Sequence, residues 1–257
     1  GAISIGVWAR PEEAYIDMSI WMVVQDAKGA SRTLTLGKIG IPSWRLFKAE
    51  LPSDLEPPLT LVSVQIFVPS HTSARSAGKL HLDAIHVTMG SDGEELMLED
   101  FETNSGWVPI VTSALSSDTL QLSAGEAIQG RRSGVFSFGI DMANGIRGIY
   151  LNPTAGPVPV VVSSSFAKAT GARVGDRLVV QVDDSWIPVV IRDTAHYFPT
   201  LSPDGGGFML AELESLLRYL NILKPTSSVG PNEVFLTEAP AGREALLQDL
   251  GEEVRVS

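Results

Sequence analysis

The N-terminal half of the chain alternates between apolar and polar residues with the period of two that is typical of half-buried β-strands. Residues 2–9 place Ile3, Ile5, Val7 and Ala9 on one face, and residues 16–25 place Met18, Ile20, Met22 and Val24 on one face. The same pattern predicts strands over residues 31–37, 44–51, 59–68 and 79–88, with a further strand-like block over residues 96–140. Short strands at roughly ten-residue spacing, separated by turn residues, favour a β-sandwich or jelly roll.

A second regime, which mixes helices and strands, begins after a boundary near residues 141–157. An apolar strand is expected over residues 157–162, and a short helix over 163–171 with Ser163 as its N-cap and Gly171 as its stop. Leucines at helical spacing predict a longer helix over residues 211–223, which Pro225 ends. The remaining elements expected are strands at 177–183, 186–192 and 233–237 and a last helix at 240–250. The sequence therefore predicts a mainly β protein with a β-sandwich over residues 1–145 and a small α+β domain over residues 150–257.

Composition and charge narrow the classes of partner. The formal net charge is −11, and the densest basic point is the pair Arg131 and Arg132. A nucleic-acid partner is therefore not expected, because such proteins carry a clustered basic surface. The chain has no cysteine, which excludes disulfides, zinc–thiolate sites and cysteine nucleophiles. The chain opens with Gly1 and Ala2 directly before a strand pattern, and we expect it to be a segment of a longer polypeptide.

Few residues suggest catalysis or metal binding. The sequence has no His-Glu-x-x-His, P-loop or Gly-x-Ser-x-Gly motif, so we expect a protein that is not an enzyme. His81 and Asp83 share a strand face, where a polar pair exposed to solvent is the simpler interpretation. The carboxylates of Asp83, Glu99, Asp100 and Glu102 would gather around one hard cation if their strands are neighbours. We therefore expect no cofactor other than a structural calcium ion, held by Asp83, Asp100 and Glu102.

Aromatic residues supply the candidate ligand-binding surface. Trp8 and Trp21 fall on the more polar faces of their strands, as do Gln65 and Phe67. A sheet face with aromatic rings among polar residues is able to stack sugars or apolar ligands. The alternative is that another domain or subunit covers these rings, because aromatic residues are enriched at interfaces.

The C-terminal regime resembles the extracytoplasmic domain of FtsX/MacB-like ABC-transporter permeases. The resemblance rests on the stretch from Val158 to Leu178, with its "Ser-x-x-x-Ala" type helix and its Gly-Asp turn at Gly175 and Asp176. It continues through residues 187–192, 197–200 and 208–217, and then through 232–236 and 240–250. These are structural turns rather than a catalytic signature, and they cover about 100 residues.

The N-terminal regime resembles a jelly-roll module of the galactose-binding or carbohydrate-binding kind. Such modules open with a "Phe-Glu…Trp" segment, as in Phe101, Glu102 and Trp107, and close with a "Leu-Asp-Asp-Ile-x-Val" strand, as in residues 82–87. Here the closing segment precedes the opening one, and Ala84 stands where those modules have a second Asp. Either two modules are each incomplete, or one module is circularly permuted, and we favour permutation because the ends of a sandwich commonly lie close together.

The resemblance implies a non-catalytic domain on the extracytoplasmic face of the cell membrane, in an integral membrane protein. Its implied partners are the flanking transmembrane helices of the parent permease and a cytoplasmic ATPase subunit, together with a carbohydrate, lipid or protein ligand. The alternative is a secreted or surface carbohydrate-binding protein that uses a Trp8/Trp21 sheet face, for which glycan binding would be lost on Trp8→Ala. A hydrolase with an appended module is a third hypothesis, which the absence of a recognisable triad disfavours.

Overall fold

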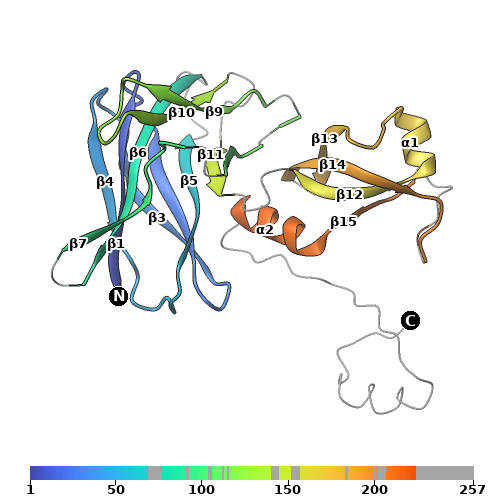
Figure 1. Cartoon of the computed structure of the whole chain (residues 1–257), viewed down its shortest axis with the longest axis horizontal. Helices are drawn as coiled ribbons and strands as arrows, with labels where there is room; N and C mark the ends of the chain where they lie inside the picture. The colour runs from blue at the N-terminus through green and yellow to red at the C-terminus, as the bar shows by residue number, and fades with distance from the viewer. Residues whose placement is uncertain are drawn as a thin grey trace, which may run out of the picture.

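The computed structural model describes residues 1–68, 77–90, 93–103, 106–111, 113–114, 116–139, 145–151, 157–182, 185–199, 201 and 207–223. Strands dominate the described residues, so the prediction of a mainly β protein is confirmed. Two antiparallel sheets face one another as a sandwich, and a smaller third sheet with two helices lies beside them (Figure 1). No helix within the described ranges is both long and apolar enough to cross a membrane.

The first sheet contains six of the described strands. Its order is β4–β1–β6–β10–β9, and β7 also pairs with β6. The strand bounds are β1 (Ala2–Pro11), β4 (Arg45–Glu50), β6 (Gly78–Met89), β7 (Glu94–Glu99), β9 (Thr119–Ala124) and β10 (Arg132–Phe138). The long strand β6 forms the middle of this sheet, with β1 on one side and with β10 and β7 sharing the other side.

The second sheet has the order β3–β2–β5–β11–β8 among the described strands. Its bounds are β2 (Ser19–Gln25), β3 (Ser31–Lys38), β5 (Thr60–Val68), β8 (Trp107–Pro109) and β11 (Gly145–Leu151). Strand β11 lies inside the domain boundary expected at 141–157, so the sandwich continues to Leu151 rather than ending at 145. Its glycines and its arginine hide the apolar alternation that would have identified it as a strand.

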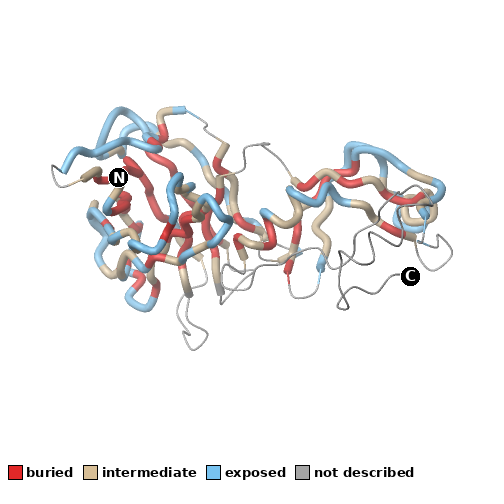
Figure 2. The backbone as a smooth tube through the Cα atoms, turned by 90° about the horizontal axis from the view of Figure 1, so that it is seen from below, coloured by how far each residue is buried: buried red, intermediate tan, exposed pale blue. Residues whose placement is uncertain are grey.

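Apolar side chains from the facing surfaces of the two sheets form one continuous core. The buried stretches of these strands are red in Figure 2. The alternation correctly assigns the inward face of β2, because Met18, Ile20, Met22 and Val24 are all buried. It also assigns the middle of β1, where Ile5, Val7 and Ala9 are buried, but Ile3 remains exposed near the end of the strand. Alternation therefore identifies the face of a strand but not how far along the strand the facing sheet extends.

The third sheet has the order β13–β14–β12–β15, with β12 and β14 parallel and the other pairs antiparallel. Its elements are β12 (Val158–Ser163), α1 (Ser164–Thr170), β13 (Arg177–Val182), β14 (Ser185–Ala195), β15 (Met209–Ala211) and α2 (Leu213–Leu223). Both predicted ends of α1 are confirmed: the Ser163 hydroxyl accepts a hydrogen bond from the Phe166 amide, and Gly171 is left-handed with φ 74°.

Helix α2 is shorter than the sequence suggests. It was expected from residue 211, but residues 209–211 pair with β12 as strand β15, and the Glu212 carboxylate then accepts hydrogen bonds from the Glu214 and Ser215 amides at the start of the helix. The strand expected at 233–237 and the helix expected at 240–250 lie outside the described residues.

Candidate functional site

The two tryptophans of the predicted ligand face lie in different sheets. Trp8 belongs to β1 of the first sheet and Trp21 to β2 of the second sheet. Both residues alternate with core residues, so each ring lies on the outer side of its own sheet, and these outer sides face away from one another. The prediction of a shared Trp8/Trp21 face is therefore wrong. Alternation tells which side of its sheet a residue occupies, but it does not tell which sheet the strand joins.

Trp21, Gln65 and Phe67 do lie together on the outer side of the second sheet. Trp21 is opposite Gln65 in the β2–β5 register, and its ring stacks on Phe67 with a centroid distance of 4.5 Å and an interplanar angle of 6°. Gln65 is fully buried, and its amide nitrogen donates to Ser63 Oγ at 2.9 Å and to the Ile222 carbonyl at 3.2 Å. This face is thus covered at Gln65 by the C-terminal end of α2, as the covered-face alternative predicts.

Helix α2 connects the sandwich to the third sheet, and we call this contact the α2 junction. It consists of Gln65, Ile110, Val111 and Tyr150 from the sandwich and of Tyr219 and Ile222 from α2. The Val111 amide donates to the Tyr219 hydroxyl at 2.9 Å, and this hydroxyl donates in turn to the Val111 carbonyl oxygen at 3.2 Å. The rings of Tyr150 and Tyr219 meet edge to face at 5.3 Å.

The α2 junction is part of a continuous apolar core. Ile110 and Tyr150 share one buried cluster with strands β12 and β14 and with α2: Val158, Val160, Val162, Ile187, Val189, Ile191, Tyr219, Leu220 and Ile222. Burial is the main reason that the pKa of Tyr219 is raised, so its hydroxyl stays protonated and keeps both of its contacts with Val111. The junction therefore has the packing of a domain interior.

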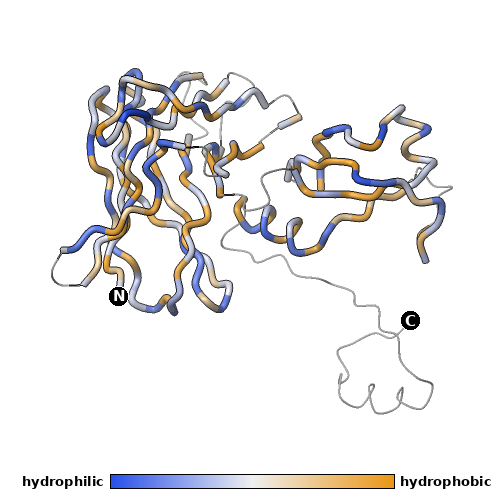
Figure 3. The backbone as a smooth tube through the Cα atoms, in the orientation of Figure 1, coloured by the Kyte–Doolittle hydropathy of each residue, from blue (hydrophilic) through white to orange (hydrophobic). Residues whose placement is uncertain are grey.

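The leucine stripe predicted from the sequence covers only part of the buried surface of α2. The stripe includes Leu220, which is buried, and Leu213, which is 51% exposed. It omits Tyr219 and Ile222, the two residues that reach the sandwich. The missed signal is that Tyr219 and Ile222 form a second apolar side next to the leucine stripe, while Glu214, Arg218 and Asn221 share the polar side. Figure 3 shows these hydrophilic and hydrophobic positions interspersed along α2. A helix that packs between two neighbours requires such a second apolar side.

The carboxylates proposed to bind calcium are engaged by backbone amides instead. Asp83 is fully buried and accepts hydrogen bonds from the amides of Ala84, Ile128 and Gln129. Glu102 accepts from the amides of Arg131 and Arg132, and Asp100 accepts from the Glu102 amide. Among the described residues, no group of three His, Asp or Glu side chains is arranged to hold a metal ion. Asp83 and Glu102 thus hold the β9–β10 connection through its main-chain amides.

The pKa values of the Asp83 and Glu102 carboxyls are shifted in opposite directions. Burial raises the pKa of Asp83, against the opposing effect of its amide hydrogen bonds. The amides of Arg131 and Arg132 lower the pKa of Glu102, which is partly exposed to solvent. Glu99 likewise serves the fold, because its oxygens accept from the Phe101 amide and from the Trp107 indole.

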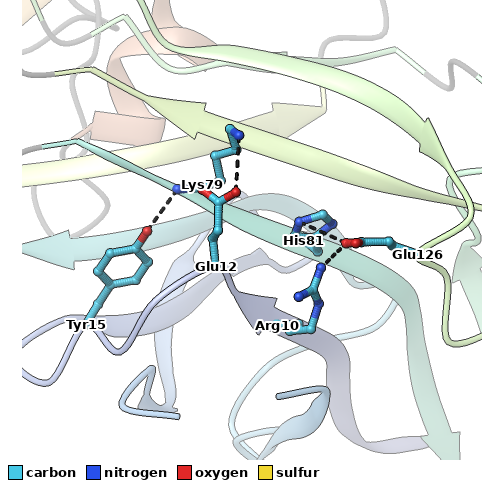
Figure 4. Close-up of polar contacts among 6 residues, drawn as sticks. All are labelled: Arg10, Glu12, Tyr15, Lys79, His81 and Glu126. Carbon is cyan, nitrogen blue, oxygen red and sulfur yellow. Dashed lines mark hydrogen bonds and ion pairs between the residues drawn. The ribbon is translucent and has the colours of Figure 1, made fainter. Parts of the chain in front are cut away.

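A polar network around His81 occupies the outer side of the first sheet. Glu126 contacts Arg10 and lies 3.5 Å from His81 Nε2, while Lys79 contacts Glu12 and the Tyr15 hydroxyl accepts from the Lys79 amide (Figure 4). Trp44 packs edge-on against His81 at 6.2 Å. The prediction that His81 and Asp83 lie on a solvent-exposed face is wrong, since both are buried beneath the β9–β10 connection. Both residues face this connection: Asp83 accepts from the Ile128 and Gln129 amides, and His81 lies beside Glu126.

We expect the stability of the protein to decrease as pH falls below about 6.5 because of His81. Burial, followed by the charge of Arg10, lowers the pKa of His81 from its ordinary value of 6.5, so the unfolded chain takes up a proton before the folded chain does. The free energy of unfolding should fall by at most about 1.4 kcal/mol per pH unit from this group. Urea unfolding at pH 7.5 and pH 5.5 measures the difference.

The control for this prediction compares two histidine substitutions. His81→Gln should reduce the pH dependence between the two conditions, whereas His196→Gln alters an exposed residue and should retain it. Equal slopes for His81→Gln and the unchanged protein would contradict the prediction.

Comparison of the chain with protein-family models, with curated proteins and with solved structures gives no match.

Proposed function

We propose that this chain is a non-catalytic extracytoplasmic domain of an ABC-transporter permease, which couples ATP-driven movement in the membrane to the handling of a substrate or partner. The observation that carries the proposal is the order of elements from β12 to α2. A strand, a short Ser-capped helix, a Gly-Asp turn, a hairpin and a further helix follow one another as the FtsX/MacB-like resemblance requires.

The α2 junction supports a mechanical role. A domain that transmits force needs a contact that does not yield when one side moves. Here the sandwich and the third sheet share one buried apolar cluster, and the hydrogen bonds of Tyr219 and Gln65 fix the position of α2 across it. Packed cores of this kind are stiff and transmit displacement. In this proposal α2 carries movement between the third sheet and the sandwich.

Within this proposal the sandwich is a circularly permuted jelly roll. The closing-type segment at residues 82–87 lies in β6, and the opening-type segment at residues 100–102 follows β7, which pairs with β6 in a hairpin. In a module of ordinary order these two segments are the two ends of the chain. Their direct connection here is what a permutation would produce, with new ends before β1 and after β11.

A carbohydrate-binding function receives less support from the geometry. Trp8 and Trp21 do not share a face, and α2 covers the sheet at Gln65.

This segment has no cysteine, so an introduced cysteine tests the proposed location once any cysteine elsewhere in the reading frame is replaced by serine. The complete reading frame that encodes this segment is expressed in its host with Val174→Cys, which alters an exposed residue of the third sheet's turn. A membrane-impermeant maleimide should label this cysteine in intact cells after removal of any outer envelope, and the protein should stay in the membrane pellet after a carbonate wash. The matched variant Val162→Cys, at a buried position, should react only after denaturation.

A second measurement tests the coupling to an ATPase. The parent protein extracted in mild detergent should co-purify with ATP hydrolysis activity. Labelling only after cell lysis, release by carbonate, or a purified membrane protein without associated ATP hydrolysis would each contradict the proposal.

A further inference from the structure

Strand β7 exposes three consecutive apolar side chains. Leu96, Met97 and Leu98 have exposed fractions of 53%, 40% and 45%. Single exposed apolar residues are normal on a protein surface, but a run of three places apolar groups on both faces of one strand. Strand β7 lies at the side of the sandwich near the start of the chain (Figure 1), and its residues 94–98 are exposed whereas Glu99 is buried.

The backbone edge of β7 is also open. Along one side of β6, β10 pairs with residues 78–82 and β7 pairs with residues 85–89. Within the described part of the chain, β7 pairs with no strand other than β6. Glu94 to Met97 run in regular register with Met89 to His86, before a register shift beside Ile85. An open edge of this kind is a template for an added strand.

The negative charge around Leu96, Met97 and Leu98 indicates which class of partner would bind there. Glu94 and Glu95 are exposed beside it, and the whole chain carries a net charge of −11. A second copy of this chain would bring the same two glutamates and a further net charge of −11 to this acidic edge, and the two copies would repel one another. An anionic membrane surface is disfavoured for the same reason. The complementary partner is an extended segment that carries both basic and apolar residues.

We propose that β7 is a docking edge that binds an extended, basic and apolar segment of a partner protein by strand addition. The main-chain groups of residues 94–97 supply the hydrogen bonds, and Leu96 and Met97, on opposite faces, contact the apolar residues of the partner. Glu94 and Glu95 attract its lysines or arginines. This inference goes beyond the proposed transporter role and does not depend on it, since it concerns a surface that the α2 junction does not include.

The test uses the full chain and two labelled ten-residue peptides, one alternating Lys with Val and one alternating Glu with Val. Fluorescence anisotropy in 50 mM salt should show the Lys peptide binding at least about tenfold more tightly than the Glu peptide, with a difference that shrinks as salt screens the charges. Hydrogen exchange should slow at the amides of residues 94–97 when the Lys peptide is bound. Equal affinity for the two peptides would overturn the proposal.

Variants separate docking at β7 from general attraction to an acidic protein. The double substitution Leu96→Ser/Met97→Ser should weaken binding of the Lys peptide at least about fivefold, and Glu94→Lys should weaken it as well. Val174→Ser removes an equally exposed apolar side chain elsewhere and should leave the affinity unchanged. Because these side chains are exposed, the fold should persist, which circular dichroism checks.

Three further outcomes would overturn the proposal. The first is a Leu96→Ser/Met97→Ser variant that binds the Lys peptide as the unchanged chain does. The second is concentration-dependent dimerisation in sedimentation velocity that this variant abolishes, which would assign the edge to a second copy. The third is binding to phosphatidylcholine vesicles that the variant abolishes while neither peptide binds, which would assign it to lipid.

Discussion

Replacing Arg147 with Met should destabilise the protein by about 3–5 kcal/mol, because it would leave the Asp118 carboxylate buried without its counter-ion. The two side chains are 1% and 0% exposed. Arg147 Nε lies 3.0 Å and Nη2 lies 2.5 Å from the two oxygens of Asp118, and Nη1 donates to the Gly139 carbonyl at 2.7 Å. Since Arg147 is in β11 and Asp118 and Gly139 flank β9 and β10, the pair connects the two sheets.

The measurement is urea unfolding of Arg147→Met beside two companion variants. Arg218→Ala breaks an exposed pair with Glu214 and should cost less than about 1 kcal/mol. The double variant Arg147→Met/Asp118→Leu should recover most of the loss, because replacing a buried ion pair by apolar groups is often close to neutral. A loss for Arg147→Met no larger than that for Arg218→Ala would contradict the prediction, because it would mean that Asp118 incurs no penalty for losing its counter-ion.

Substituting Gly148 with Ala should destabilise the protein by about 2–6 kcal/mol, because an added methyl group meets backbone atoms that have no room to yield. Gly148 has φ 144°, and a Cβ there would lie 2.2 Å from the Val64 carbonyl oxygen and 2.7 Å from the Gln65 Cα. Gly148 is opposite Gln65 in the β5–β11 register, and its carbonyl accepts from the Ile110 amide at 2.8 Å. A shift at this position would therefore disturb the α2 junction as well as the second sheet.

Gly125→Ala is the matched control for this prediction. Gly125 also has a positive φ, of 93°, but no atom lies within 4 Å of an added Cβ, so this variant measures the backbone strain without the collision. Thermal unfolding should show Gly148→Ala to be clearly the less stable of the two. Equal melting temperatures would mean that β5 and β11 move apart at little cost and that the junction is not rigid there.

Much of the fold follows from local sequence patterns. The period-two alternation in β1, β2, β5 and β6 identifies strands because a half-buried strand must present apolar residues to only one side. The caps of α1 are equally local, since Ser163 and Gly171 satisfy the ends of the helix within a few residues. Strand β11 was not identified, because Gly148 and the buried Arg147 serve contacts with distant residues, and such contacts have no local pattern.

The sequence by itself determined that this is a mainly β and acidic protein, that it has a Ser-capped helix, and which apolar residues of its main strands face the core. Only the tertiary structure decided that Trp8 and Trp21 belong to opposite sheets, since alternation is identical in every strand and strand pairing depends on distant segments. It also decided that Asp83 and Glu102 bind main-chain amides, because every residue type except proline has such an amide and composition cannot identify the partner. The two-sided burial of α2 was decided there as well, since it requires both neighbours of the helix to be in place.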